Sequence, residues 1–414
     1  MLKRFGATAA IAATLAVVVA ATLGSPASAK VSKASKATPL CKRAGIGYGG
    51  PLSGPAQFLG DDQLNWEKLF ISYWNKGKKI PGVPKGLKRV KLSIPNAGLA
   101  DGKLQAGPAG TAARAVVADK KILGFVGFAG SNENLGGGPV FDRAHLAYVS
   151  GSATADNLTS KLKNFFRVVP NNSKQAKAGV SYVVGKLKLK SGAKVMIVDD
   201  GEAYGIGIAD AAQKLFKAKH MNVDREQVPE STSTSTADFH TVAQKAVTIG
   251  AKLVYAPTQT ATDSQTFVQL LHADGYHGGF MATDGSVSPT QFNYPGAYIS
   301  FFGPDITAVK ASFRNAYKSR YGAKSADDPF GAPSFVATEM LAVAMSKQCA
   351  ATHRHKITRA LVTKRLKGVK LPSTILGYSM AFANKADHKH GPSAGVTVFQ
   401  VQKNGKYKEV YAAG

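Results

Sequence analysis

Small hydroxyl side chains follow two neighbouring apolar stretches of this sequence. Ser131 comes directly after LGFVGFAG, and Ser152 and Thr154 come after LAYVSG. Open parallel α/β sheets bind their ligands at the carboxyl ends of the strands. Helix N-termini at the same edge favour an anionic group. The segment 123–160 therefore predicts a binding site for a small carboxylate.

The sequence lacks the motifs that would indicate catalysis, a metal or a cofactor. No G-x-S-x-G elbow, H-E-x-x-H pair or P-loop occurs. GIGIAD at 205–210 ends in Asp, where a dinucleotide loop needs Gly or Ala. The His pairs 353/355 and 388/390 lie in polar, lysine-rich sequence, and nothing in their spacing joins them. We expect no catalytic residue, no cofactor and no metal.

The N-terminus has the three parts of a secretory signal peptide. Lys3 and Arg4 precede an apolar run from Thr8 to Leu23, and Ala27-Ser28-Ala29 supplies a small-residue cleavage site. We expect residues 1–29 to be removed and 30–43 to form a basic linker. The alternative, a retained membrane anchor, needs an apolar run of roughly 20 residues. We predict an exported protein without membrane insertion, in the periplasm or the extracellular cell envelope.

The chain has two cysteines. An exported protein meets an oxidising compartment, so we expect one disulfide, Cys41 with Cys349. Cys41 does not follow the apolar run directly, which argues against lipid attachment.

The formal net charge of +28 raises the question of an anionic partner. The lysines are scattered, and no basic motif interleaved with aromatic residues appears. We therefore favour a solvated basic surface and expect no nucleic-acid partner. Loose attraction to an anionic envelope is compatible with either interpretation.

Strand and helix patterns alternate along the chain, which favours parallel sheets covered by helices on both faces. The mature length suggests two such domains. Connections containing proline at 165–172 and 299–305 are candidate crossings between them. The expected strands are 45–50, 89–97, 193–200, 221–228, 251–257 and 278–284, besides the two apolar stretches before Ser131 and Ser152. The expected helices are 63–75, 109–118, 174–184, 206–216, 239–248, 264–274 and one starting near Ser334, while STSTST at 231–236 reads as a surface loop.

Several segments, in order and at compatible spacing, resemble the leucine/isoleucine/valine-binding proteins, which are type I periplasmic solute receptors of amino-acid ABC transporters. These segments are the leader, GPLSGPAQFLGDDQ (50–63), GFAGSN, YVSGSATADNLT, DDGEAYGIG (199–207) and ATDG (282–285). The resemblance implies an α/β protein with two Rossmann-like lobes joined by a three-segment hinge. The implied first lobe is 44–168 plus 305–375, and the second is 169–304 plus 376–414.

The resemblance also implies a ligand site made by both lobes. Ser131 and Thr154 match residues that hold an α-carboxylate, and Ser152 matches one whose backbone carbonyl receives an ammonium. Tyr204 and Asp284 match residues of the second lobe that meet the head group on closure, and Phe330 matches an aromatic that lies against the ligand's side chain.

Three features depart from the family pattern. Asp284 stands where a longer Glu is usual, Asn132 belongs to an SNEN run in place of a hydroxyl-rich one, and Gln259 falls near a family Tyr. The expected ligand contacts are Ser131, Asn132, Ser152, Ala153, Thr154, Tyr204, Gln259, Asp284 and Phe330.

The chemistry of these residues agrees with the head-group part of the resemblance. An enclosed zwitterion must have both of its charges paired, because an unpaired buried charge is costly. Ser131, Thr154 and Asp284 supply hydroxyls and one carboxylate, although each could alone be a helix cap or turn former.

We expect a monomer that delivers an amino acid, of branched-chain type or a related small carboxylate, to an ABC transporter permease. Hinge closure on the ligand would be the mechanism. The alternatives are a ligand-sensing receptor subunit of the same fold and an exported amide or peptide hydrolase.

Overall fold

The computed structural model describes residues 38–54, 56–95, 104–229, 236–322, 328–382, 388–390 and 395–413. The expected signal peptide at 1–29, the linker before Thr38 and most of the STSTST loop lie outside these residues.

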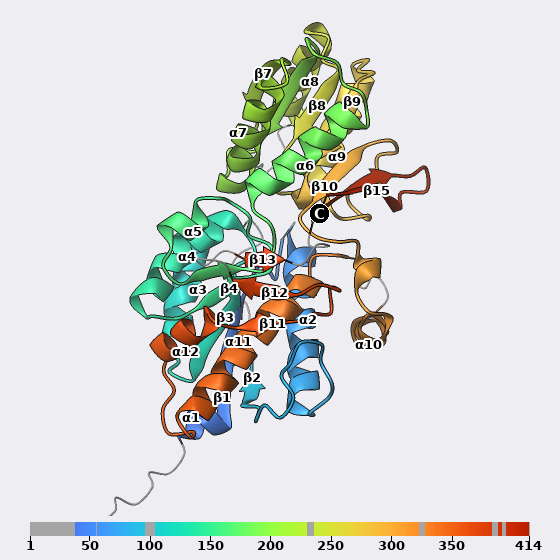
Figure 1. Cartoon of the computed structure of the whole chain (residues 1–414). Helices are drawn as coiled ribbons and strands as arrows, with labels where there is room; N and C mark the ends of the chain where they lie inside the picture. The colour runs from blue at the N-terminus through green and yellow to red at the C-terminus, as the bar shows by residue number, and fades with distance from the viewer. Residues whose placement is uncertain are drawn as a thin grey trace, which may run out of the picture. The chain divides into compact units, whose positions relative to one another are not determined.

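The first sheet is wholly parallel, with strand order β2-β1-β3-β4-β5 (Figure 1). Its strands are β1 (Arg43–Gly49), β2 (Lys91–Ser93), β3 (Ile122–Gly127), β4 (Tyr148–Ser150) and β5 (Phe165–Arg167). All but β2 are almost entirely buried, as expected for a sheet that helices cover on both faces.

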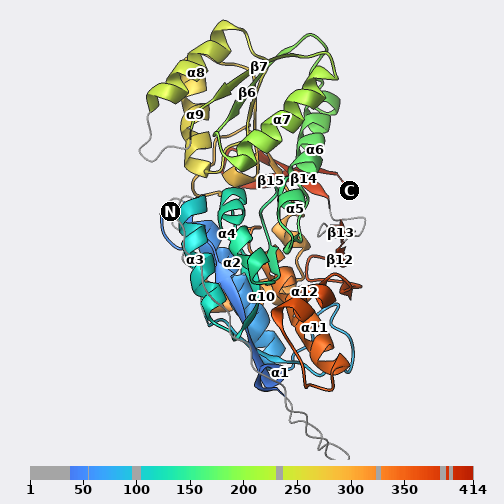
Figure 2. The ribbon, with the colours of Figure 1, turned by 90° about the vertical axis from the view of Figure 1, so that its left-hand side faces the viewer.

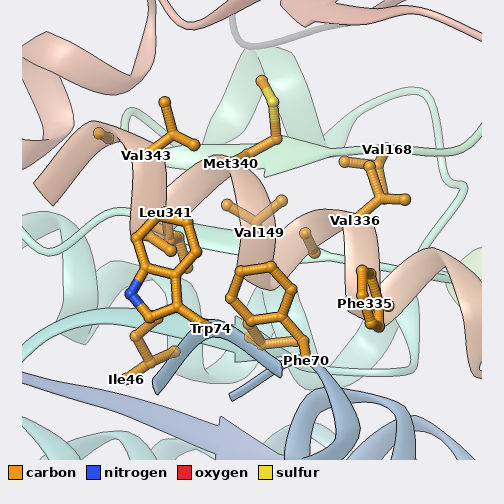
Figure 3. Packing of buried hydrophobic residues seen from close by; sticks show 14 of the residues in the cluster. Ile46, Phe70, Trp74, Val149, Val168, Phe335, Val336, Met340, Leu341 and Val343 are labelled. Atoms are coloured by element: carbon orange, nitrogen blue, oxygen red, sulfur yellow. The ribbon is translucent and has the colours of Figure 1, made fainter. Parts of the chain in front are cut away.

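Two helix pairs cover this sheet. Helices α2 (Gln57–Asn75) and α11 (Ala332–Ala351) pack on one face, and α3 (Ala106–Ala118) and α4 (Ser131–Arg143) on the other. Helix α11 is apolar on almost every side, which is typical of a helix surrounded by protein. In Figure 3, Met340 and Leu341 of α11 lie with Val149 of the sheet and Trp74 of α2.

The second sheet has the order β15-β14-β10-β9-β8-β6-β7. Strands β6 (Lys194–Asp199), β7 (Asn222–Gln227), β8 (Leu253–Ala256), β9 (Gly279–Ala282) and β10 (Tyr298–Phe301) are parallel, and β14 (Val396–Val401) and β15 (Tyr407–Ala413) extend the sheet antiparallel. Figure 2 shows β6 and β7 between α6 (Asn172–Gly185) and α7 (Ala203–Lys217) on one side and α8 (Thr236–Thr248) and α9 (Ala261–Ala273) on the other.

The remaining elements are short or peripheral. The helices are α1 (Pro39–Lys42), α5 (Leu158–Lys161), α10 (Ala311–Tyr321) and α12 (Arg359–Leu366), with 3-10 turns η1 (Asp284–Ser286) and η2 (Ile306–Ala308). A third, antiparallel sheet contains β11 (Lys370–Leu371), β12 (Met380–Phe382) and β13 (His388–His390).

The expected alternation of strands and helices agrees with these elements, and two differences are informative. Helix α2 begins at Gln57, six residues earlier than predicted. A side chain at Gly60 would put its Cβ 1.7 Å from the Pro51 carbonyl oxygen, so this glycine permits a close approach and does not end the helix. The strands after residue 370 were not predicted.

The division into lobes stays a proposal, and the packing changes one of its boundaries. The predicted crossing at 375/376 would assign Tyr378 and Met380 to the second lobe. Both belong to the hydrophobic cluster of the first sheet, and β12 pairs with β11. We therefore propose that the third crossing lies between β13, which pairs with β12, and β14, which pairs with β10.

The predicted disulfide is present. Cys41 of α1 and Cys349 of α11 are bonded, with their Cα atoms 5.7 Å apart. Both are fully buried in the hydrophobic cluster of the first sheet. The bond therefore joins two elements that pack on the same sheet.

Candidate functional site

The candidate site lies at the point where each parallel sheet reverses its strand order. In the first sheet β1 lies between β2 and β3, so the loops after β1 and β3 leave in opposite directions. In the second sheet the reversal falls between β6 and β8. A crevice outside the strand ends forms at such a switch point. Loops following β1, β3, β4, β6, β8 and β9 all contribute to one cavity.

The space without atoms within this cavity amounts to about 420 Å³, part of which is open to solvent. Seven of the nine predicted ligand contacts line it: Ser131, Ser152, Ala153, Tyr204, Gln259, Asp284 and Phe330. The other described residues of the lining are Ala56, Phe58, Leu59, Leu104, Ala129, Gly130 and Gly285. Asn132 and Thr154 are not among the described lining residues.

The start of α4 forms one side of the cavity. Ser131 is its first residue, and the Ser131 hydroxyl accepts the Ala155 N–H at 3.2 Å. Glu133 accepts the Gly130 N–H at 2.7 Å and so fixes the helix entry. The first N–H groups of a helix have no partner within the helix and favour an anion. This edge can therefore receive a carboxylate.

Hydrogen bonds from buried polar side chains fix the turn after β4. The Ser152 hydroxyl donates to the Ala129 carbonyl at 2.8 Å and accepts from Gln63 Nε2 at 2.7 Å. The Ser150 hydroxyl donates to the Phe128 carbonyl at 2.7 Å and accepts the Ala153 N–H at 3.0 Å. The Ser152 hydroxyl proton is thus engaged within the protein, and the side chain positions the turn.

Thr154 lies behind the cavity lining. Its carbonyl accepts from Arg167 Nη1 at 3.0 Å and from the Asn172 N–H at 2.8 Å. Its hydroxyl is fully buried and has no hydrogen-bond partner among the described residues. A buried hydroxyl without a partner is costly, so a ligand atom that reached it would be stabilised.

Asp284 supplies the charge of the site. It begins η1 after β9, is 4% exposed, and is the only charged residue among the described residues of the lining. Its Oδ1 accepts from Gln175 Nε2 at 2.5 Å and lies 2.6 Å from the Tyr204 hydroxyl. Burial raises the pKa of Asp284 to about 7, although the bonds from Tyr204 and Gln175 favour the ionised form.

Tyr204 links this carboxylate to its surroundings. Its hydroxyl also lies 2.6 Å from Thr283 Oγ1 and accepts the Gly285 N–H at 3.2 Å. Gln175 donates to the Ser300 carbonyl at 3.0 Å as well. The side chain of Asp284 is therefore oriented by groups from α6, α7 and its own turn before any ligand arrives.

Aromatic and aliphatic side chains make up the apolar part of the lining. Phe330 lies edge-on to Phe58, with ring centroids 6.3 Å apart, and packs against Phe301 and Phe302 at 5.5 Å each. Of these rings, Phe58 and Phe330 line the cavity, as Leu104 does. Phe330 therefore belongs both to the core and to the site.

Two predicted contacts have structural roles that the sequence did not indicate. Asn132 Oδ1 accepts the Ala203 N–H at 3.1 Å, which joins the start of α4 to the start of α7. The Gln259 backbone N–H donates to Asp200 Oδ2 at 2.7 Å. Asp200 is buried, and burial raises its pKa to about 7.

Sequence reasoning missed the residues that orient the site. Gln63 and Gln175 lie within helices and are 89 and 109 residues from the partners they orient. No local pattern marks such amides. Phe58, by contrast, lies in the GPLSGPAQF segment, which resembles the leucine/isoleucine/valine-binding proteins. That resemblance could have indicated Phe58 as a residue of the site.

The described residues hold no group of three or more His, Cys, Asp or Glu side chains arranged for a metal ion. Within the same residues, no helix is both long and apolar enough to span a membrane.

The family model for the periplasmic binding protein matches residues 44–406. An amino acid binding protein of Pseudomonas aeruginosa is 24% identical over 59% of this chain and 61% of its own length. The Leu/Ile/Val-binding protein homolog 3 of Brucella melitensis is 28% identical over 51% of this chain and 53% of its own. The chain thus spans only about half to three-fifths of the curated relatives it matches.

Solved structures of other proteins resemble this chain over nearly its whole length. A leucine binding protein LivK from Thermotoga maritima has a TM-score of 0.75 at 16% identity, covering 90% of this chain and 99% of its own. A solute binding protein from R. palustris in complex with benzoate has a TM-score of 0.70 at 15% identity, covering 89% and 96%. These likenesses confirm the predicted fold class with two Rossmann-like lobes.

Proposed function

Because the chain belongs to the periplasmic binding protein family, we propose that it is an exported receptor that binds an amino acid with an apolar side chain, of branched-chain type, and delivers it to an ABC transporter permease. The receptor works as a monomer and has no catalytic role. The ligand docks between the loops of the two sheets, and closure of the lobes selects the ligand-bound state.

Asp284 is the observation that carries this proposal. The Asp284 carboxylate is buried in the lining of the cavity, is already oriented by Tyr204 and Gln175, and has no cationic partner among the described residues. The ammonium of an amino acid supplies that cation, and its carboxylate finds neutral donors at the start of α4. The apolar wall around Phe58 and Phe330 accepts an aliphatic side chain.

An aromatic carboxylate is a second candidate, because the same Asp284 has a pKa near 7. When protonated it does not repel a ligand that lacks an ammonium. The rings of Phe58 and Phe330 could then face the ligand ring. The benzoate complex of the R. palustris protein shows that a similar fold can hold such an acid.

Isothermal titration of the mature protein with leucine, 4-methylpentanoate and benzoate tests the proposal. Of the three ligands, leucine should bind most tightly. The variant Asp284→Asn should have a lower affinity for leucine and an unchanged affinity for the other two ligands. Loss of one partner of a desolvated charge pair costs about 2–5 kcal/mol, which is well over tenfold. Thr154→Ala should weaken leucine binding less than Asp284→Asn does, because Thr154 lies behind the cavity lining and is not among its described residues.

Three results would change the proposal. If Asp284→Asn binds leucine as tightly as the parent does, the ligand is not an amino acid. If the parent binds benzoate more tightly than leucine, the aromatic carboxylate is favoured. Conversion of the ligand, detected by mass spectrometry after long incubation, would favour the hydrolase alternative. Uptake of labelled leucine that persists in cells lacking this chain would favour the sensing alternative.

A further inference from the structure

The segment that carries Phe330 enters α11 through a close contact with α2. Phe330 lines the ligand cavity, and the next residue, Gly331, directly precedes the helix. A side chain at Gly331 would place its Cβ 2.1 Å from Trp66 Cδ1 and 2.4 Å from Asp62 Oδ2, so the backbone lies against both of these α2 residues. The position of Phe330 is therefore tied to two side chains of α2.

A tyrosine of α10 contacts the same two side chains. The Tyr317 hydroxyl donates to Asp62 Oδ1 at 2.5 Å, and the Tyr317 ring stacks on Trp66 with the ring centroids 4.6 Å apart. Tyr317 and Trp66 are fully buried, and Asp62 is 2% exposed. Trp66 also lies edge-on to Phe335 in the first turn of α11, with centroids 6.2 Å apart. Asp62, Trp66 and Tyr317, which we call the α2–α10 cluster, thus pack together against the start of α11.

The carboxyl group of Asp62 can serve this cluster without a charge. Burial raises the pKa of Asp62 well above its usual range, and the negative charge of Asp328 raises it further. The neutral form is thereby favoured, and its Oδ1 still accepts the bond from Tyr317. Asp328 acts at a second point, because its Oδ1 accepts the Phe330 N–H at 3.1 Å. Both carboxyl groups therefore contact the residues that lead into α11.

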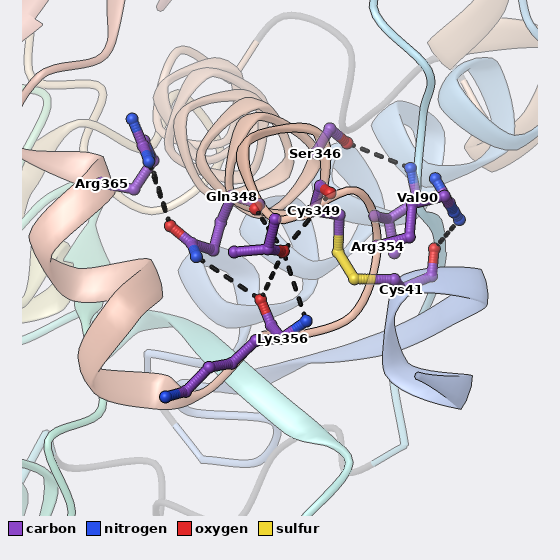
Figure 4. Close-up of a disulfide and its surroundings, with 9 residues drawn as sticks. Cys41, Val90, Ser346, Gln348, Cys349, Arg354, Lys356 and Arg365 are labelled. Carbon is purple, nitrogen blue, oxygen red and sulfur yellow. Dashed lines mark hydrogen bonds between the residues drawn. A yellow bond between two sulfur atoms is a disulfide. The ribbon is translucent and has the colours of Figure 1, made fainter. Parts of the chain in front are cut away.

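The other end of α11 is fixed independently. Cys349 is bonded to Cys41, and Ser346 Oγ accepts the Val90 N–H at 3.1 Å (Figure 4). With a rise of 1.5 Å per residue, Ser346 lies about 20 Å along the helix from its first turn. Contacts at that distance cannot orient the side chain of Phe330. Its orientation depends on contacts near the start of α11, and the α2–α10 cluster is one of them.

We propose that the α2–α10 cluster positions Phe330 against the side chain of the bound amino acid and so sets the preference of the cavity for long aliphatic side chains over short ones. This inference rests on the proposed function, because it needs a ligand whose side chain reaches the apolar part of the lining. A ring that is already held in one orientation does not have to be ordered by the ligand, which favours affinity. A single methyl group gains little from that order. The three residues of the cluster are not among the described residues of the lining, so they are positioning residues.

Titration calorimetry of the disulfide-bonded mature protein with leucine and alanine tests this inference. The two ligands share a head group, so the ratio of the alanine to the leucine dissociation constant measures the preference for the longer side chain. In Tyr317→Phe, which removes the bond to Asp62 and keeps the stacked ring, this ratio should fall by about two- to tenfold while alanine affinity stays unchanged. Asp62→Leu should lower the ratio as well. Asp62→Asn keeps a neutral acceptor for Tyr317 and should bind as the parent does.

Tyr276→Phe is the matched control. It removes one hydrogen bond, from a buried tyrosine to the Gly279 carbonyl at 2.8 Å, and Tyr276 is not among the described residues of the cavity lining. The control should lower the free energy of unfolding in urea and leave the ratio of dissociation constants unchanged. Equal losses of the ratio in Tyr317→Phe and Tyr276→Phe would show a general effect of stability and would overturn the proposal.

A double-mutant cycle shows whether the cluster acts through Phe330. Phe330→Ala should lower the ratio by itself, and Tyr317→Phe added to it should cause no further fall, because the positioned ring is then missing. A further fall would mean that the cluster affects the ligand by another route, which would overturn the positioning role.

Two other results separate this inference from the proposed function. If the parent binds leucine tightly and Tyr317→Phe keeps the full ratio, the positioning role is refuted and the proposed function stands. If the parent binds neither leucine nor alanine, both are refuted.

Discussion

At the scale of single residues, Asp284 is buried and has no countercharge in the described part of the chain. Burial raises its pKa to about 7, so in the free protein near pH 7 the carboxyl is protonated in a large fraction of molecules. An ammonium bound beside it favours the ionised form. The pKa of Asp284 must then fall on binding, and a proton must be released.

We therefore expect leucine affinity to rise with pH between 5.5 and 7.5. Below the free pKa, binding has to expel a proton, and the affinity falls by up to about tenfold per pH unit. Titration calorimetry at pH 7 in buffers of different ionisation enthalpy should detect proton release. Asp284→Asn, which cannot titrate, should bind weakly with no proton release. Proton uptake by the parent would contradict an ammonium partner for this carboxyl.

The neighbouring polar residues show why burial of this acid is tolerated. Tyr204 and Gln175 both direct donors at one oxygen, Oδ1. A fixed arrangement of donors costs nothing to reorganise when the ligand arrives, which favours affinity. The same donors limit the rise in pKa that burial alone would cause.

At the scale of elements, the starts of α4 and α7 meet across the site. The Asn132 side chain on α4 accepts the backbone N–H of Ala203, the first residue of α7. That N–H has no partner within its own helix. The bond therefore stabilises the arrangement in which both helices face the cavity.

We expect Asn132→Ala to weaken binding of every ligand by the same factor. Removing a hydrogen bond worth about 0.5–1.5 kcal/mol shifts the equilibrium between lobe arrangements by roughly two- to tenfold. Titrations with leucine and benzoate should show parallel losses, unlike Asp284→Asn. Asn222→Ala, which removes an exposed bond to the Gly192 carbonyl in a turn, is the control. A loss confined to leucine would mean that Asn132 contacts the head group directly.

Sequence patterns predicted the repeating elements well because buried parallel strands and amphipathic helices leave local signals. The expected strand 193–200 and the expected helix 206–216 correspond to β6 and α7 within a few residues. The same logic placed Ser131 and Asp284 at strand ends. Both line the cavity.

Other features depend on contacts between distant residues and could not be predicted. Helix α2 continues through Gly60, which packs closely against Pro51, whereas a glycine judged from the local sequence alone suggests a helix end. Gln175 reaches Asp284 only because α6 packs beside β10 and the η1 turn. The exclusion of Thr154 from the described lining follows from the detailed course of the turn after β4. No spacing rule specifies that course.

At the scale of the whole molecule, the disulfide and the ligand cavity belong to different packing units. Cys41 and Cys349 lie in the cluster that α2 and α11 form on the first sheet. The apolar lining residues Leu59, Leu104 and Phe330 belong instead to a cluster shared with the second sheet. We therefore expect a rearrangement at the cavity to leave the packing around the disulfide unchanged.

This separation predicts that stability and ligand affinity respond differently to loss of the disulfide. The bond closes a segment of 308 residues, and removing a native disulfide costs about 2–5 kcal/mol of unfolding free energy, chiefly because the unfolded chain gains freedom. Urea unfolding of Cys41→Ser/Cys349→Ser should show that loss. Its leucine affinity should stay within about twofold of the parent, since the helix starts and strand ends that line the cavity are held by other contacts. A loss of affinity in proportion to the loss of stability would mean that the two packing units are coupled through α11, whose first turn follows directly on Phe330 in the chain.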